Sequence, residues 1–283
     1  NLNAYPWEQC VKILNPLSSD LGVMRQTLLF GGLESIRRNI NRKAANLKFF
    51  EVGNTYKYEK EKWSEENPIK AYQQEYHLAL WITGKRVQGS WAHADEESSF
   101  YELKANVENI LRRIGIAQNA LTTEASDNNI FDKALTLKTR GGKTIVEMGI
   151  LSHKLLKKMD IAQTVFYADI HWTSLMKAIR KNKLQFQELS KYPSVSRDLA
   201  LLLDSNIEFA QIEEIARQTE KKLLKKVELF DVYEGKNLPE GKKSYAVNFI
   251  LQDETKTLND KAIDAIMQKL IKNITTKLGA ELR

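Results

Sequence analysis

The chain has one cysteine, Cys10, among its 283 residues. A single thiol cannot form a disulfide within the chain, and nothing else in the composition suggests an oxidising compartment. No apolar run approaches the roughly 20 residues that a membrane-spanning helix needs. The opening residues, NLNAYPWEQC, show neither a signal-peptide pattern nor an initiator methionine. We therefore expect a cytoplasmic chain that makes no membrane contact and is a fragment of a longer protein.

Histidine is also scarce, and its four positions do not show the close spacing of a metal-binding motif. The histidines are His77, His93, His153 and His171. The triplet Gly142-Lys143-Thr144 is reminiscent of a phosphate-binding loop, but the full signature needs a glycine where Leu137 stands. We interpret this segment as a glycine turn between two strands, and we predict no metal site.

The C-terminal part of the chain has no excess of positive charge. The formal net charge is +7, yet residues 187–283 hold 16 Lys and Arg against 16 Asp and Glu. This balance excludes a generic polyanion-binding surface there, so any contact with nucleic acid must depend on local placement. The lysines that cluster around one hairpin are Lys221, Lys222, Lys225, Lys226, Lys242 and Lys243.

What the sequence does contain is a globular composition, with 42% hydrophobic and 28% charged residues, and a length that suits two domains. Leucine and isoleucine recur every three or four residues at 29–40, which predicts a helix. Further helices are predicted at 100–115 and 152–160. Strands are predicted at 47–59, 77–84, 133–139 and 143–151. A break predicted at 181–196 separates a domain of residues 1–186 from one of residues 187–283.

The C-terminal domain alternates strands and helices in a regular order. The predicted elements are a strand at 198–204, a helix at 207–224, two strands within 225–253, a helix at 259–279 and a short strand at 280–283. The order βαββαβ predicts a ferredoxin-like unit. Its four-stranded sheet carries both helices on one face and leaves the other face open.

The hairpin KKVELFDVYEGKNLPEGKKSYAVNFILQD shows which side chains reach the open face. Phe230 and Val232 are apolar and are expected to face the helices, which puts Asp231 and Tyr233 on the open side. The small residues expected beside them are Ala200, Ser244 and Ala246. A ring above small neighbours can stack on an unpaired base. The alternative is that Tyr233 only pairs with a cross-strand neighbour and that Asp231 is a solvated edge residue.

Long stretches of the chain resemble one protein family. KYPSVSRDLALLLD, LFDVYEGKNLPEGKKSYAVNFILQDETKTLND and LGAELR resemble the ferredoxin-fold anticodon-binding domain of bacterial phenylalanyl-tRNA synthetase β subunits. NPLSSDLGVMRQTLLFGGLESIRRN, LKFFEVGNTY and SWAHADEESSFYELKANVENILRRIG resemble the preceding domain of that subunit, which has a class II synthetase core-like fold. The resemblance implies an α+β chain, in which a class II synthetase-like antiparallel sheet domain precedes a ferredoxin-like βαββαβ domain.

The resemblance implies a place in phenylalanine–tRNA ligase, an ATP- and magnesium-dependent α2β2 enzyme whose active site lies in the α subunit. FEVGNTYKYE resembles the class II strand that ends in Phe-Arg-x-Glu, but Lys57 stands where the arginine clamps the ATP phosphate. Lysine lacks the planar two-pronged donor geometry of arginine. GILSHKLLKKMDI, where a second arginine is expected, contains none. We therefore expect no catalytic residue and no cofactor in this chain.

The resemblance also implies two partners, tRNA(Phe) and the α subunit. Tyr233 is expected to stack on an anticodon base, and Asp231 is expected to accept hydrogen bonds from the edge of that base. Ala200, Ser244 and Ala246 are expected to leave room for the base, and the neighbouring phosphates are assigned to Lys242 and Lys243. The residues expected at the interface with the α subunit are Leu29, Leu33, Ile36 and Ile40.

Two other functions stay open at this stage. Residues 1–186 could form an adenylate-forming enzyme domain, although Lys57 and the missing second arginine argue against it. The open face of the C-terminal sheet could instead dock a protein, which would make the chain an interaction module.

Overall fold

The computed structural model describes residues 4–18, 21–116, 120–180, 188, 190–235 and 237–283. The chain divides into two compact units, residues 1–184 and 185–283. The domain boundary predicted between residues 186 and 187 lies outside the described residues. No helix among the described residues is long and apolar enough to cross a membrane.

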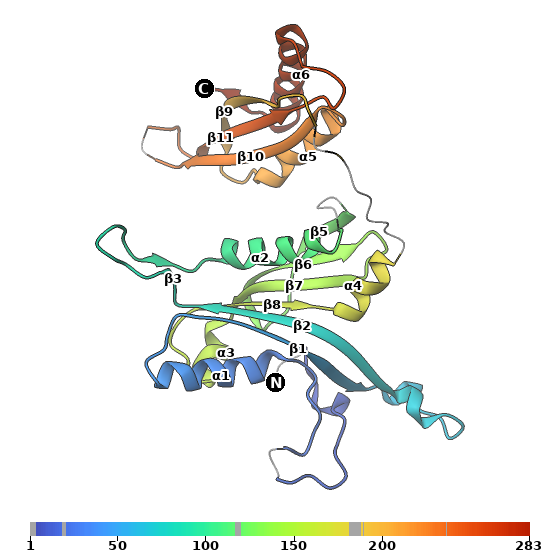
Figure 1. Cartoon of the computed structure of the whole chain (residues 1–283). Coiled ribbons are helices and arrows are strands. Elements are labelled where there is room, and N and C mark those ends of the chain that lie inside the picture. Colours follow the sequence, from blue (N-terminus) through green and yellow to red (C-terminus); the bar gives the residue numbers. More distant parts are fainter. Residues whose placement is uncertain (1–3, 19–20, 117–119, 181–187, 189, 236) are drawn as a thin grey trace. The chain divides into compact units, whose positions relative to one another are not determined.

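The first unit is built on a six-stranded antiparallel sheet (Figure 1). In spatial order its strands are β1 (Leu47–Tyr58), β2 (Tyr72–Thr83), β8 (Val165–Ile170), β7 (Thr144–Leu151), β6 (Phe131–Thr139) and β5 (Leu121–Ala125). The turn between β6 and β7 contains Gly142 with a φ of 78°, a conformation that suits glycine. The Gly-Lys-Thr triplet therefore belongs to a β-hairpin, and the interpretation as a glycine turn is confirmed.

Helices cover both faces of this sheet (Figure 1). On one face pack α1 (Leu29–Asn41) and α3 (His153–Lys158); on the other pack α2 (Phe100–Arg113) and α4 (Trp172–Ile179). Neighbouring residues of β2 show the division, because Trp81 is buried in the core under α1 and Ile82 in the core under α2. The shorter elements are η1 (Trp7–Gln9), η3 (Lys60–Lys62), η4 (Pro68–Ala71), β3 (Lys85–Val87) and β4 (Glu96–Glu97).

The apolar face of α1 packs inside the unit. Leu29, Leu33 and Ile36 are fully buried against the sheet, and Ile40 packs against the same core. Leu29, Leu33 and Ile36 have no exposed surface with which to contact another chain, so their assignment to a subunit interface is wrong. Ile40 is only partly buried, and its assignment to the interface stays a prediction. An apolar helical stripe shows that a face is buried, and the partner that buries it is here the chain's own sheet.

The second unit is a four-stranded antiparallel sheet with the chain order βαββαβ, as predicted. Its spatial order is β10 (Leu224–Tyr233), β11 (Lys242–Leu251), β9 (Val195–Asp204) and β12 (Glu281–Leu282). The helices are α5 (Phe209–Thr219) and α6 (Asp260–Leu278). The side chain of Asn259 caps the start of α6, and Gly279, with a φ of 63°, ends it. Both units mix helices with antiparallel sheets, so the α+β prediction is confirmed.

Replacing Gly32 by alanine should destabilise the first unit. A methyl group at Gly32 would lie 2.2 Å from the indole of the buried Trp81, whereas one at Gly31 meets nothing closer than 3.9 Å. Gly32→Ala should therefore cost about 1–3 kcal/mol of unfolding free energy through overpacking. Gly31→Ala, the matched control, should be neutral or stabilising by up to about 1 kcal/mol, because alanine favours the helix. All five tryptophans lie in the first unit, so urea unfolding followed by tryptophan fluorescence isolates it; equal midpoints for the two variants would contradict the expected clash.

Candidate functional site

One face of the second sheet carries no helix among the described residues. Both α5 and α6 contribute to a single core with the other face. On β11 the side chains of Tyr245, Val247 and Phe249 are buried in that core, so the alternate residues point to the uncovered side. We call that side the open face; its residues on β11 are Ser244, Ala246, Asn248 and Ile250.

A β-bulge decides which side chains of β10 reach the open face. Leu229 pairs with Val247 on the helix side. The next pair is Asp231 with Ala246, so Phe230 between them is an extra residue without a partner. Phe230 is 60% exposed, and the prediction that it faces the helices is wrong. Strict alternation cannot hold across the adjacent apolar residues Leu229 and Phe230, and here the bulge shifts the alternation by one residue.

Beyond the bulge the predicted alternation holds. Val232 pairs with Tyr245 and belongs to the helix side. Asp231 pairs with Ala246, and Tyr233 pairs with Ser244, which puts both side chains on the open face. The predicted phase was therefore correct for these two residues, although Phe230 was misplaced.

The middle of the open face is lined by small side chains. Ala246 lies between Asp231 on β10 and Ala200 on β9, so the three form one row across the sheet. In the next row Ser244 lies between Tyr233 and Leu202. The residues that the sequence predicted to leave room, Ala200, Ser244 and Ala246, thus form a shallow floor beside Asp231 and Tyr233.

Arg283 reaches across this floor from the opposite edge of the sheet. Its backbone N–H donates to the carbonyl of Ala200 at 3.1 Å, which continues the pairing of β12 with β9. Its guanidinium carbon lies 5.7 Å from the ring centroid of Tyr233. Because β11 and β9 separate the two backbones, the ring and the guanidinium meet above the small side chains. The sequence predicts the terminal strand, but nothing in its pattern shows that Arg283 reaches Tyr233.

The acidic groups of the open face differ in what they contact. Asn248 donates to the Oδ1 atom of Asp198 at 2.5 Å, so that carboxylate is engaged. Asp231 is exposed, and within the described part of the chain its carboxylate has no hydrogen bond or ion pair. It is a charged acceptor without an internal donor, and it lies beside an aromatic ring.

The two lysines assigned to phosphates lie on different faces. Lys242 pairs with Asp204, and its Nζ atom lies 2.9 Å from the carboxylate of that residue. Lys243 pairs with Leu203, which is fully buried on the helix side. Its own exposure is 7%, and its Nζ atom lies 4.7 Å from the ring centroid of Tyr245. The assignment of Lys243 to a phosphate on the open face is therefore wrong.

The first unit contains a partly buried polar cluster that the sequence pattern does not reveal. The Nδ1 atom of His77 on β2 lies 2.6 Å from Asp169 on β8, and Glu75 and His171 lie next to it. Burial disfavours the charged form of His77, but the contacts with Asp169 and then Glu75 outweigh burial and raise its pKa to about 9. His171 and then His77 hold the pKa of Glu75 well below its usual range. Two carboxylates thus make this place favourable for a cation.

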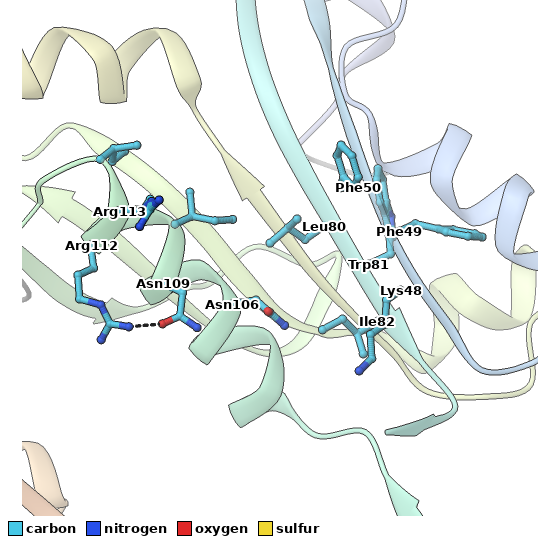
Figure 2. A pocket seen from close by; sticks show the side chains of 12 residues that line it. Lys48, Phe49, Phe50, Leu80, Trp81, Ile82, Asn106, Asn109, Arg112 and Arg113 are labelled. Carbon is cyan, nitrogen blue, oxygen red and sulfur yellow. Dashed lines mark hydrogen bonds between the residues drawn. The ribbon is translucent and has the colours of Figure 1, made fainter. Parts of the chain in front are cut away.

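The first unit also has a pocket of about 960 Å³ between α2 and the β1–β2 edge of the sheet (Figure 2). Its wall is largely apolar and includes Phe49, Phe50 and Leu80. Figure 2 shows Arg112 at its side, donating to the Oδ1 atom of Asn109 at 2.6 Å. The pocket lies away from Glu75 and His77 and shares no residue with them. It combines an apolar wall with a cationic rim, and it contains none of the residues predicted from the sequence.

Comparison with known proteins gives a match for each unit. Residues 1–172 match the family described as phenylalanyl tRNA synthetase beta chain CLM domain. Residues 190–283 match the family described as ferredoxin-fold anticodon binding domain.

Several curated proteins named phenylalanine–tRNA ligase beta subunit are similar to the chain. Those of Bacteroides fragilis and Porphyromonas gingivalis are 58% and 49% identical to it over 282 residues. Both alignments cover 100% of this chain and 34% of the relative, so the chain spans about a third of their length. Among solved structures, pyrrolysyl-tRNA synthetase from Desulfitobacterium hafniense is 13% identical, with a TM-score of 0.42, over 63% of this chain and 58% of that one.

Proposed function

Since the chain belongs to the phenylalanyl-tRNA synthetase beta chain family, we propose that it is the C-terminal part of a phenylalanine–tRNA ligase β subunit. In this proposal residues 187–283 recognise the anticodon region of tRNA(Phe). Residues 1–186 form a non-catalytic scaffold that binds the α subunit. The ATP and magnesium that the whole ligase needs are then bound outside this chain.

One observation supports the RNA-binding role. On the open face, a carboxylate without an internal partner lies beside an aromatic ring. Asp231 and Tyr233 are alternate residues of β10 and point the same way. Small side chains beside them form a floor that a flat base can reach when the side chain of Arg283, which lies over it, moves aside. A base that lies on this floor can stack against the ring of Tyr233 while its edge meets Asp231.

The chemistry of Asp231 selects the kind of base. An ionised carboxylate only accepts hydrogen bonds, and guanine offers two neighbouring donors, N1–H and N2–H. Adenine presents an acceptor at N1, which would face the carboxylate unfavourably. Asp231 therefore suits a guanine at one anticodon position. Arg283, whose guanidinium already lies near the ring, is placed to face a phosphate or a second base.

Electrostatics support a binding mode that depends on base contacts more than on phosphates. Residues 187–283 have no net charge, and Lys242 already pairs with Asp204. Lys225 lies 2.7 Å from Glu254 and is also paired. Few phosphates would then be neutralised, so the dependence of affinity on salt should be shallow for an RNA-binding protein.

A protein partner on the second unit is the competing function. Phe230 and Val232 are 60% and 49% exposed, and β10 lies at the edge of its sheet. Exposed apolar side chains on an edge strand suit the addition of a strand from another protein. Comparing intact tRNA with tRNA that lacks the anticodon loop separates the two functions, because only RNA recognition requires that loop.

The scaffold role places the contact with the α subunit on the exposed aromatic residues of the first unit. Trp91 is 99% exposed in the loop between β3 and β4. Asp95 holds that loop, since it accepts from the backbone N–H of Gly89 and from Lys85, each at 2.5 Å. A fully exposed indole on an ordered loop loses little conformational entropy on binding, as expected of an interface anchor.

Tyr233→Ala should weaken binding of tRNA(Phe) by the roughly 1–3 kcal/mol of one base stack and leave the fold intact. Asp231→Asn should reduce discrimination between guanine and adenine at one anticodon position, because an amide offers both a donor and an acceptor. Filter binding with the parent tRNA and with anticodon variants measures both effects. Lys261→Ala, an exposed change on α6, is the control. If all three variants bind like the parent, the open face is not the RNA surface.

Trp91→Ala should weaken association with the purified α subunit by about 2 kcal/mol or more, because a buried interface tryptophan often dominates binding. Trp63→Ala, which removes a half-exposed indole, should have little effect. Isothermal titration of the α subunit into each variant measures the difference. Equal affinity of the parent and Trp91→Ala for the α subunit would show that the β3–β4 loop is not part of the interface.

The chain by itself should not catalyse exchange between pyrophosphate and ATP. Lys57 is an exposed residue of β1 and cannot form the two-pronged contact that arginine makes with a phosphate. The assay should show no exchange above a control without protein, at any phenylalanine concentration. Exchange that exceeds this control would show that the first unit is an adenylate-forming enzyme domain.

A further inference from the structure

Three potential metal ligands converge at one place in the first unit. Glu75 and His77 are alternate residues of β2 and share a face of the sheet. His171 directly follows β8, whose last residue, Ile170, pairs with Leu78 on β2. The two imidazole rings therefore lie side by side, with centroids 4.6 Å apart.

The distances from Glu75 to the two histidines are too long for direct hydrogen bonds. The Oε2 atom of Glu75 lies 3.6 Å from Nε2 of His77 and 3.8 Å from Nδ1 of His171. Hydrogen bonds between nitrogen and oxygen are about 2.7–3.2 Å long. A tetrahedral zinc ion with bonds of about 2.0–2.1 Å holds neighbouring ligand atoms about 3.4 Å apart. One ligand atom from each residue lies within 4.8 Å of the other two, so small side-chain rotations bring all three to such an ion.

Asp169 orients the most buried of the three ligands. Its Oδ1 atom lies 2.6 Å from Nδ1 of His77, and only 7% of the His77 side chain is exposed. His77 donates its Nδ1–H to Asp169, so its Nε2 atom is the one that faces Glu75, and a zinc ion would bind there by replacing the Nε2 proton. A carboxylate behind a histidine in this way is the usual outer partner of zinc-bound imidazole.

We propose that Glu75, His77 and His171 form a zinc-binding site, with Asp169 orienting His77. Two imidazoles and one carboxylate are a common zinc ligand set, and they leave the fourth position for water. Imidazole favours zinc over calcium or magnesium, which prefer oxygen ligands. A bound ion would join β2 to the start of α4. This site is distinct from the proposed RNA surface and does not depend on it.

Titration of zinc chloride into the metal-free chain, without an affinity tag, tests the proposal. Calorimetry should show one equivalent of Zn²⁺ bound, and Co²⁺ as a substitute should give the visible absorption of a four-coordinate site. Asp169→Asn should lower the affinity about 10–100-fold, the usual effect of losing an outer partner. His171→Ala should lower it at least as much.

The controls are the other two histidines of the chain, which are exposed and lie outside the cluster. His93→Ala and His153→Ala should bind Zn²⁺ like the parent. Glu75→Gln and His171→Ala change partly exposed side chains, so they test the site even if replacement of the buried His77 prevents folding. Absence of stoichiometric binding, or equal affinity of the parent and His171→Ala, would overturn the proposal.

Discussion

Both helices of the second unit pack on the same face of a four-stranded sheet, and this one-sided burial constrains the rest of that unit. Strand pairing satisfies the backbone of the open face, so its side chains are free to serve binding. Small residues occupy the middle of that face, while Asp231, Tyr233 and Arg283 lie toward its edges. The first unit differs because helices cover both faces of its sheet. Its candidate contacts are therefore the β3–β4 loop, the pocket beside α2 and the partly buried polar cluster.

The bulge at Phe230 determines which side chains of β10 reach the open face. Without it, strict alternation from the buried Val227 would direct Asp231 and Tyr233 toward the helices. One inserted residue reverses that phase and exposes the phenylalanine ring. Bulges often reorient side chains at functional positions, because changing one pair costs less than shifting a whole strand. The exposure of Phe230 is thus a consequence of how the acid and the tyrosine reach the open face.

Charge is arranged differently in the two units. Lys225 and Lys242 have acidic partners, whereas Asp231 has none among the described residues and is a charge that an incoming donor can satisfy. In the first unit, Glu75 and Asp169 flank His77, which is almost fully buried. Asp169 is mostly buried and Glu75 is partly exposed, and carboxylates withdrawn from water need compensating positive charge, which a proton or a metal ion can supply. The polar cluster therefore has the charge that the proposed zinc ion would balance.

The sequence by itself determined the family, the α+β class and the βαββαβ order of the C-terminal domain. These properties depend on local periodicity and on long specific motifs, both of which can be read without distant contacts. It also placed Asp231 and Tyr233 correctly, through a strand phase that is valid beyond the bulge. It did not place Phe230, because a bulge depends on pairing with a neighbouring strand.

Only the tertiary structure decided what each apolar or charged face contacts. The stripe of α1 packs on its own sheet, Lys243 turns toward the helices, and Arg283 extends to Tyr233 across two intervening strands. His77 and His171 are far apart in the chain and become neighbours because β2 pairs with β8. The physical reason is the same in each case. A local pattern records that a side chain is apolar or charged, but the partner that buries or neutralises it is set by strand pairing and helix packing between segments distant in sequence.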